Sequence, residues 1–301
     1  MIRIANAPCS WGVLEFETMA TTASASQVLD DMATAGYAGT ELGDWGFLPT
    51  ESRALAAEVG SRGLGLVGAF VPVALSRADA IDEGLERAVR IAHLLAEASA
   101  ATDAPVLVLA DHNASVPNRT DRAGRIRSED GLSDAEWDAF AGRAERIAAA
   151  VRERTGLRTA FHHHCDGYVE TSCEIEALMS RTAPSLLGLC LDTGHLTYAG
   201  GEPVAAIARY GERIWHVHLK DCDPAVVRTA RAEEWNYHTA VRNGIFCELG
   251  RGSVPFRRVS DALDALTYCG WMVVEQDVLP GRGTPALSAT RNREYLRRLG
   301  L

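Results

Sequence analysis

LCLDTGH at residues 189–195, HVHLKD at 216–221 and VVEQD at 273–277 each join a short apolar run to polar or charged residues. The runs have the length and composition of β-strands, and the polar residues come where each strand is expected to end. Asp192, His218 and Glu275 occupy these three strand ends. Carboxylate oxygens and imidazole nitrogens bind divalent metals, so the segments predict three strands that converge on one metal site.

The alternation of side chains along two of these strands supports this interpretation. In 187–192 the leucines fall on one face and Asp192 falls on the other. In the next strand, the inward face predicted by the same alternation carries His216, His218 and Lys220, and the apolar face carries Trp215, Val217 and Leu219. Lys220 is the only lysine in the chain. Either it has a chemical role that arginine cannot take, or it is a chance of composition.

Short apolar runs alternate with longer amphipathic ones along the whole chain, which is typical of repeated β-α units around a parallel sheet. Eight strands are expected, at 2–6, 38–43, 64–71, 105–110, 158–163, 187–192, 213–219 and 271–276. Helices are expected between them, at 25–35, 50–62, 79–101, 133–155, 171–182, 202–210 and 255–268, with a closing helix at 285–299. Eight such units predict an α/β fold, a closed (β/α)8 TIM barrel, formed by one domain over residues 1–301. A doubly wound open sheet is the alternative, but no G-x-G-x-x-G follows the first strand.

Two long connections are expected to overhang the carboxyl-terminal mouth of the barrel, where barrel enzymes hold their sites. Residues 111–132 form a polar loop, and 221–252 contain a predicted helix at 224–242.

The composition excludes several classes of partner. The net charge of the 301-residue chain is −10, with a pI of about 5.4, so a nucleic acid or an anionic membrane has no electrostatic support. Seven cysteines without a C-x-x-C pair, and an N-terminus without a charged region before an apolar one, favour a reduced cytoplasmic protein. A small molecule is therefore the expected partner, and the sequence is also compatible with a homo-oligomer.

The histidine run FHHHCDG at 161–167 is the natural source of a fourth metal ligand. Strand alternation places His162 and His164 on one face and His163 on the other. We assign His162 to the metal and His164, nearer the mouth, to proton transfer. His163 is expected to have a structural role.

Other strand ends and aromatic residues are weaker candidates. Glu41 ends the second strand as a possible catalytic acid or base, and Asn6 ends the first as a possible substrate ligand, although such residues also cap helices or pair with arginines. His195 lies three residues beyond Asp192, on what we expect to be a loop. Trp11, Trp45 and Phe70 could contact a sugar-like ring, whereas packing is the alternative for any one of them.

Several motifs along the chain together carry a family resemblance. NAPCSWGVLEFE (6–17), GTELGDWGFLP (39–49), VGAFVPV (67–73), the triple histidine, LDTGHLTYAGG (191–201), HVHLKD and GWMVVEQD (270–277) resemble the inosose dehydratase branch of the xylose-isomerase-like TIM barrels. The resemblance runs nearly end to end. The strand-end motifs are shared by many sugar isomerases and epimerases, so they specify the fold and the metal site better than the reaction. The chain departs from the pattern where His162 replaces a usual glutamate, where Asp44 replaces a proline, and where CDGYVET follows the histidines.

The resemblance implies a metal-dependent dehydration of a cyclic polyhydroxy ketone such as scyllo-inosose, through an enediolate. The implied metal is Mn, Co or Mg, with Zn or Fe as further options, held by Asp192, His218, Glu275 and His162. His164, Glu41 or Lys220 could remove the carbon-bound proton, and His195 could protonate the departing hydroxyl. In the pairing that we favour, His164 and His195 do this work and Lys220 stabilises the enolate oxygen.

Four alternatives follow from the same residues. A ketose isomerase or 3-epimerase would form the same enediolate, as would a lyase or hydratase of 3-keto-glycosides. An endonuclease of the superfamily would need more metal ligands and a basic face. A non-catalytic sugar-binding protein would be expected to have lost some of Asp192, His218 and Glu275, and the chain keeps all three.

Overall fold

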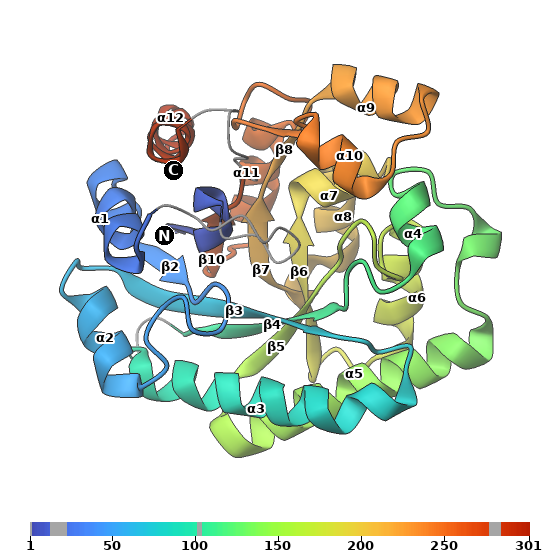
Figure 1. The fold of residues 1–301 in the computed structure, drawn as a ribbon, viewed down its shortest axis with the longest axis horizontal. Helices are drawn as coiled ribbons and strands as arrows, with labels where there is room; N and C mark the ends of the chain where they lie inside the picture. The colour runs from blue at the N-terminus through green and yellow to red at the C-terminus, as the bar shows by residue number, and fades with distance from the viewer. Residues whose placement is uncertain (1, 13–22, 101–103, 277–283) are drawn as a thin grey trace.

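Eight parallel strands close into a barrel in the computed structural model, in the order β1-β10-β7-β6-β5-β4-β3-β2 (Figure 1). The structure describes residues 2–12, 23–100, 104–276 and 284–301. The barrel strands are β1 Arg3–Asn6, β2 Gly39–Glu41, β3 Gly65–Val73, β4 Val106–Asp111, β5 Arg158–His162, β6 Leu187–Asp192, β7 Ile214–Leu219 and β10 Trp271–Val274. All eight overlap the predicted strands, and the predicted TIM barrel is confirmed.

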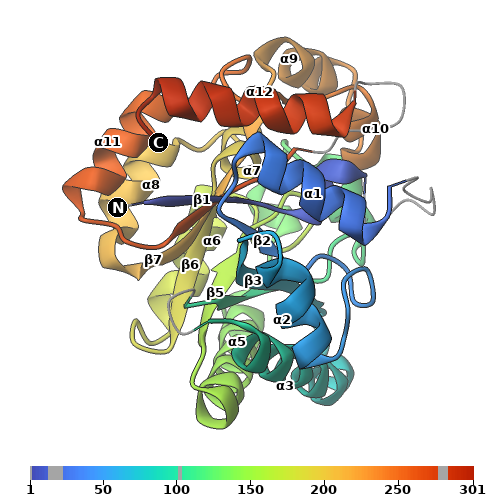
Figure 2. The same cartoon turned by 90° about the vertical axis from the view of Figure 1, so that its left-hand side faces the viewer.

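Helices surround the strands on the outside of the barrel (Figures 1 and 2). They are α1 Ala25–Ala35, α2 Ser52–Gly60, α3 Ile81–Ala98, α5 Asp134–Thr155, α6 Ser172–Arg181, α8 Pro203–Tyr210, α11 Phe256–Ala265 and α12 Pro285–Arg298. The last helix packs beside the first, which brings the two ends of the chain together (Figure 2). Among the described residues, no helix has the length and apolar character needed to span a membrane.

Polar residues at the helix ends set where several of these helices begin. The hydroxyl of Ser24 accepts a hydrogen bond from the backbone N–H of Gln27 at the start of α1, and Gly36 ends this helix in a left-handed conformation. At the start of α6, Thr171 and Glu174 form a capping box, in which each side chain satisfies a backbone N–H of the other residue.

The barrel wall separates two apolar layers. Alternate strand residues such as Leu189 and Val217 point outward and join the large core under the helices. Inward apolar residues fill the lower part of the barrel, where Val106, Ala160 and Cys190 form a cluster. Polar inward residues replace them toward the carboxyl-terminal ends, so the candidate site residues lie above a packed apolar layer.

Additional short elements lie over the carboxyl-terminal mouth. They are α4 Pro117–Arg122, α7 Thr193–Tyr198, α9 Pro224–Ala232, α10 Tyr237–Arg242, the antiparallel pair β8 Asp221–Cys222 and β9 Phe246–Cys247, and the 3-10 turns η1 Pro8–Trp11, η2 Ala78–Ala80 and η3 Ser128–Asp130. A fourth 3-10 turn, η4 Gly211–Arg213, lies at the opposite end of the barrel, directly before β7. Both long connections thus lie at the mouth, as expected. The one at 111–132 is not wholly a loop, because it contains α4 and η3.

The helix predicted at 224–242 is wrong as a single element, because it breaks into α9 and α10. Glu234 adopts a φ of 52°, which no α-helix can accommodate. Asn236 then begins α10, with its side chain accepting the backbone N–H of Thr239. The periodicity of the apolar residues continues across the break and hides it.

The expected orientation of Trp215 is also wrong. A register shift between β6 and β7, at Leu189 and Cys190, breaks the alternation at this point. The indole ring therefore packs against the inner cluster at the bottom of the barrel, where a Cβ at Gly188 would lie 2.2 Å from the ring. Such a bulge re-aims a side chain without any signal in the hydrophobic pattern.

Candidate active site

One possible metal ligand comes from each of four neighbouring strands. His162 ends β5, Asp192 ends β6, His218 lies one residue before the end of β7, and Glu275 directly follows β10. These strands are adjacent in the barrel, in the order β10-β7-β6-β5. One donor atom of each residue lies within 4.8 Å of the donor atoms of the other three. The structure therefore brings together the four residues that the sequence analysis assigned to a metal.

The donor atoms of this cluster face one another without the hydrogen bonds that buried polar atoms normally form. Nδ1 of His218 lies 3.2 Å from Oε1 of Glu275 and 4.0 Å from Oδ2 of Asp192. Nε2 of His162 lies 3.6 Å from the same Asp192 oxygen. Nε2 of His162, Oδ2 of Asp192 and Nδ1 of His218 are buried and have no hydrogen-bond partner among the described residues. Two nitrogens and two oxygens of this kind fit a divalent cation.

The charge of the cluster also fits a cation. Burial opposes ionisation of Glu275, but the charges of His218 and Lys220 hold the pKa of its carboxyl well below the usual value. Burial likewise opposes ionisation of Asp192, but its interactions with His162 and Lys220 lower the pKa of that carboxyl. Both acids are therefore anionic near neutral pH.

Asp192 is held in place from two sides. Its backbone N–H donates to Nε2 of the fully buried His163 (3.1 Å), which gives that histidine the structural position expected for it. Its Oδ1 atom accepts the backbone N–H of His195 at 2.7 Å and so caps the first turn of α7. His195 thus lies in a helix and not on the expected loop.

His164 and His195 form a close pair whose ring centroids are 3.8 Å apart. The backbone of Cys165 contacts both rings. Its carbonyl oxygen accepts a hydrogen bond from Nδ1 of His164, and its N–H donates to Nδ1 of His195 at 3.2 Å. A neutral imidazole carries one hydrogen, so Nε2 of His164 has a lone pair and Nε2 of His195 has the N–H. The two rings therefore present opposite hydrogen-bonding groups.

Both histidines of this pair are held in the neutral form. Burial, followed by the charges of His162 and Lys220, keeps the pKa of His164 well below its usual value. Burial, followed by His164 and Lys220, does the same to the pKa of His195. For His195 the hydrogen bond from Cys165 also requires the neutral state, because Nδ1 accepts there.

Lys220 reaches into the space between the four possible metal ligands and the histidine pair. Its Nζ lies 3.3 Å from Oε2 of Glu275 and 3.4 Å from Nε2 of His195, and 4.7 Å from the centroid of the Phe246 ring. The glycine of the LDTGH motif allows this placement, since a Cβ at Gly194 would lie 2.6 Å from Cγ of Lys220.

Glu41 lies at the end of β2, and its carboxylate is engaged by two histidines. Oε1 is 2.8 Å from Nε2 of His216 and 3.0 Å from Nε2 of His218. Burial opposes ionisation, but the charge of His218 and the hydrogen bonds of both histidines lower the pKa of Glu41 to about 2. Such a carboxylate is a weak base, so the possible role of Glu41 in taking a proton loses support.

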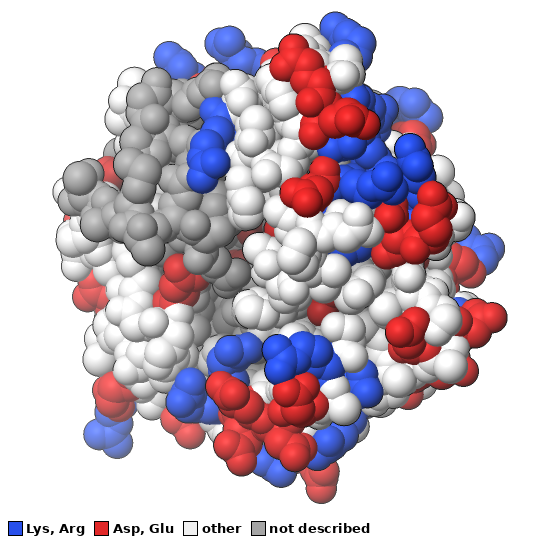
Figure 3. All heavy atoms as spheres, turned by 45° about the vertical axis from the view of Figure 1, so that its right-hand side comes forward, with Lys and Arg blue, Asp and Glu red and all other residues white. Residues whose placement is uncertain are grey.

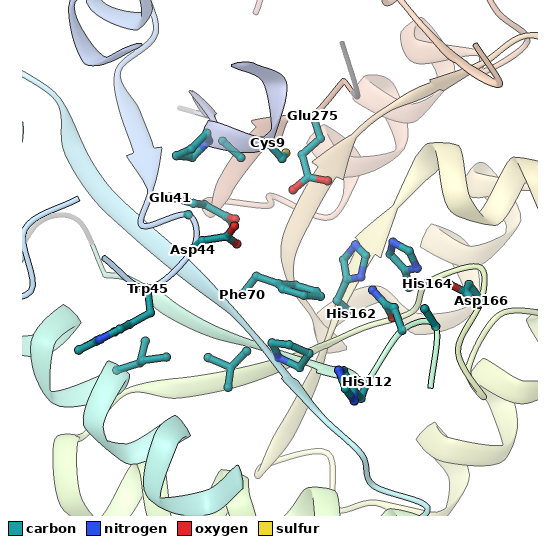
Figure 4. A pocket seen from close by; sticks show the side chains of 18 of the residues that line it. Cys9, Glu41, Asp44, Trp45, Phe70, His112, His162, His164, Asp166 and Glu275 are labelled. Carbon is teal, nitrogen blue, oxygen red and sulfur yellow. The ribbon is translucent and has the colours of Figure 1, made fainter. Parts of the chain in front are cut away.

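A cavity of about 620 Å³ opens above these residues. Glu41, His162, His164, Lys220 and Glu275 line it. In Figure 4, the carboxylates of Glu41 and Asp44 lie near each other, and Glu275 and His162 point into the same space. These five residues therefore share one opening, whereas Asp192, His195 and His218 are fully buried and absent from the described lining.

The four predicted substrate ligands divide into two groups. Trp45 and Phe70 line the cavity, and the ring of Phe70 meets His162 edge-on at 5.7 Å. Asn6 and Trp11 are absent from the described lining. Asn6 is fully buried at the end of β1, and Trp11 packs into the outer core from η1. Packing, the alternative weighed for Trp11, is what its surroundings support.

Further residues of the site come from the connections over the mouth, and the sequence did not predict them. The hydroxyl of Tyr237 lies 3.4 Å from Nε2 of His164, and the ring of Phe246 lies 4.8 Å from that of His195. Asp166 lines the cavity with a φ of 86°, unusual for a residue other than glycine. Strand periodicity cannot find such residues. The only available signal was the composition of 221–252, which holds three aromatic residues in a polar segment.

The strands close into a parallel barrel, and metal-binding residue types gather at its carboxyl-terminal mouth. This arrangement is typical of TIM-barrel enzymes, which hold their active sites at that end. The model of the family described as "Xylose isomerase-like TIM barrel" matches residues 29–299, and the chain belongs to this family.

Named relatives lie at about 30% identity over nearly the whole chain. An inosose dehydratase of Geobacillus kaustophilus (strain HTA426) is 31% identical over 99% of this chain and 94% of its own length. The rhizopine catabolism protein MocC of Rhizobium meliloti is 33% identical over 99% of this chain and 88% of its own length. Among solved structures, D-psicose 3-epimerase of Clostridium cellulolyticum H10 has a TM-score of 0.70 at 15% identity and covers 99% of both chains. This last likeness concerns the fold alone.

The charge on the described part of one face argues against a polyanionic ligand. Acidic and basic side chains lie beside one another there and do not form a stripe of one sign (Figure 3). An endonuclease would need a continuous basic face, so that alternative gains no support.

Proposed function

We propose that the protein is a divalent-metal-dependent hydro-lyase that removes water from a cyclic polyhydroxy ketone of the inosose type. The observation that carries the proposal is the four-residue donor cluster beside two histidines of opposite tautomer. Relatives named inosose dehydratase at about 30% identity support the choice of reaction.

His162, Asp192, His218 and Glu275 would hold the cation, and Mn, Co or Mg suits their mixture of imidazole and carboxylate. A cation bound there supplies Lewis acidity, which draws electron density from a ketone oxygen and acidifies the neighbouring C–H bond. The remaining steps belong to side chains of this chain.

Proton removal is assigned to Nε2 of His164, because its lone pair is directed away from the Cys165 carbonyl. The ammonium of Lys220 stabilises the negative charge that develops on the enolate oxygen. Its position next to Glu275 puts it at the edge of the metal cluster.

His195 contacts the departing hydroxyl through its Nε2–H group. Because Nδ1 accepts a backbone N–H, this ring is a hydrogen-bond donor and not an imidazolium acid. In the proposal, the hydroxyl leaves as water with the proton that His164 took from carbon. The organic product is an enol, which becomes a diketone by moving its hydroxyl hydrogen to carbon.

A 3-keto-glycoside is the second candidate substrate, and the size of the cavity favours it. A cavity of about 150 Å³ holds a benzene-sized ring, whereas this one measures about 620 Å³. This volume exceeds that of one ring, and Trp45 is an aromatic lining residue that a second ring could contact.

Proton NMR in heavy water tests the proposed reaction. Metal-loaded protein is mixed with scyllo-inosose, a ketohexose or a 3-keto-glucoside, and each sample is repeated after removal of metal with a chelator. We expect loss of water from the inosose to give a diketone, only when metal is present. An intact inosose beside a ketose that exchanges its carbon-bound proton or changes configuration would make the enzyme an isomerase or epimerase instead.

Replacing His164 with glutamine should slow turnover by about 10² to 10⁴-fold, the usual contribution of a general base. Glutamine keeps a polar side chain of similar length but has no basic nitrogen. Turnover and exchange of the carbon-bound proton with heavy water should fall together, while metal content stays at the wild-type value. His112→Gln is the matched control, since His112 lines the same cavity but lies away from Glu275 (Figure 4). Wild-type proton exchange in His164→Gln would contradict the assignment.

A further inference from the structure

Glu41 occupies a position that the backbone and a neighbouring glycine prepare for a carboxylate. The register between β2 and β3 shifts between Thr40 and Glu41, and the side chain of Glu41 turns into the barrel, where its exposed fraction is only 2%. A Cβ at Gly68 would lie 3.2 Å from Oε1 of Glu41, so the glycine leaves room for this oxygen.

His216 and His218 reach this oxygen from the other side. They are two residues apart on β7 and therefore both point inward. Each is fully buried and places Nε2 within 3.0 Å of Oε1 of Glu41. An ionised carboxylate only accepts hydrogen bonds, so both rings carry their hydrogen on Nε2.

The hydrogen on Nε2 of His218 determines what its other nitrogen can do. A histidine binds a cation in its neutral form, and with the one remaining hydrogen on Nε2 the lone pair is on Nδ1. Nδ1 is the atom that lies 3.2 Å from Oε1 of Glu275 and faces Asp192. The contact with Glu41 therefore directs a lone pair of His218 into the donor cluster.

We infer that Glu41 is a positioning residue for cation binding, which fixes the tautomer and the ring orientation of His218 and does not touch the reacting atoms. The inference rests on the proposed metal-dependent function. Carboxylates behind metal-binding histidines commonly act in this way, and their loss lowers metal affinity by about 10 to 100-fold. His216 holds the same oxygen and keeps the carboxylate directed at β7.

Calorimetric titration with Co²⁺ alone, without substrate, tests the inference on Glu41→Gln and Glu41→Ala. We expect the dissociation constant to rise by about 10-fold for glutamine, which keeps a neutral acceptor oxygen, and by up to about 100-fold for alanine. Asp44→Asn is the matched control, because its carboxylate lines the same cavity near Glu41 (Figure 4). This variant should bind Co²⁺ like wild type.

A second measurement separates a positioning role from a general loss of structure. Nitrogen-15 NMR of the histidine rings in metal-free protein, at a pH high enough to leave His218 neutral, should place its one hydrogen on Nε2 in wild type and distribute it over both nitrogens in Glu41→Ala. Thermal unfolding of each metal-free variant checks that it folds. Equal Co²⁺ affinity in wild type and in folded Glu41 variants overturns the inference and leaves the proposed function standing. A wild-type protein that binds no divalent metal overturns both.

Discussion

Asp192→Asn is expected to lose most of its cation affinity and to lower turnover by about 10³-fold, which corresponds to about 4 kcal/mol of transition-state stabilisation. Oδ2 of Asp192 is the oxygen that faces Nε2 of His162 and Nδ1 of His218. Asparagine removes its negative charge. It keeps an oxygen that can accept the N–H of His195, so the start of α7 should survive the change. Elemental analysis of metal content and the NMR dehydration assay together measure the effect.

Asp111→Asn provides the control for a buried carboxylate at the mouth. Its two oxygens accept backbone N–H groups of Leu75 and Tyr168 and lie outside the four-residue cluster. This variant should retain its metal even if it loses some stability. If Asp192→Asn keeps both a full complement of metal and the wild-type rate, the ligand assignment is wrong.

The convergence of the four donors could be predicted because it depends on regular structure. Strand alternation gives the face of Asp192 and His218, and parallel strands place their carboxyl ends at the same mouth. Local sequence therefore determines most of the geometry of the four possible metal ligands. The same reasoning failed for Trp215, because a register shift depends on how two distant strands pair and not on either sequence alone.

The tautomers of the histidine pair could not be predicted. They depend on the two backbone groups of Cys165, which lies in an irregular turn directly after β5. The engagement of Glu41 by His216 and His218 joins residues 175 and 177 positions apart. Residue types can suggest an acid and a base, but hydrogen-bond partners decide which nitrogen carries the hydrogen.

A buried ion pair holds the segment after the triple histidine against the connection over the mouth. Arg119 in α4 is fully buried and forms two hydrogen bonds to Glu174, of 2.8 and 3.0 Å. Its Nε atom donates to the carbonyl oxygen of Gly167 at 2.8 Å. Because His164 lies three residues before Gly167, the pair stabilises the part of the chain that carries the proposed base.

Arg119→Met should lower the free energy of unfolding by about 3 to 5 kcal/mol, since removing one partner leaves the charge of Glu174 buried without its counterion. That is a large part of the roughly 5 to 15 kcal/mol by which proteins are usually stable. Methionine fills much of the space of the arginine side chain, so lost packing contributes little. Urea unfolding followed by circular dichroism measures the change.

The exposed pair of Arg209 and Glu176 offers the matched comparison, with side chains 65% and 41% exposed and a shortest contact of 2.6 Å. Arg209→Met should cost only about 0 to 1 kcal/mol, because water already solvates both charges. Arg119→Met combined with Glu174→Gln should recover part of the stability lost by the single variant, since no unpaired buried charge remains. If Arg119→Met and Arg209→Met unfold at the same urea concentration, the pair does not hold the mouth together. Equal turnover in Arg119→Met and wild type would separately show that the position of His164 does not depend on the Arg119–Glu174 pair.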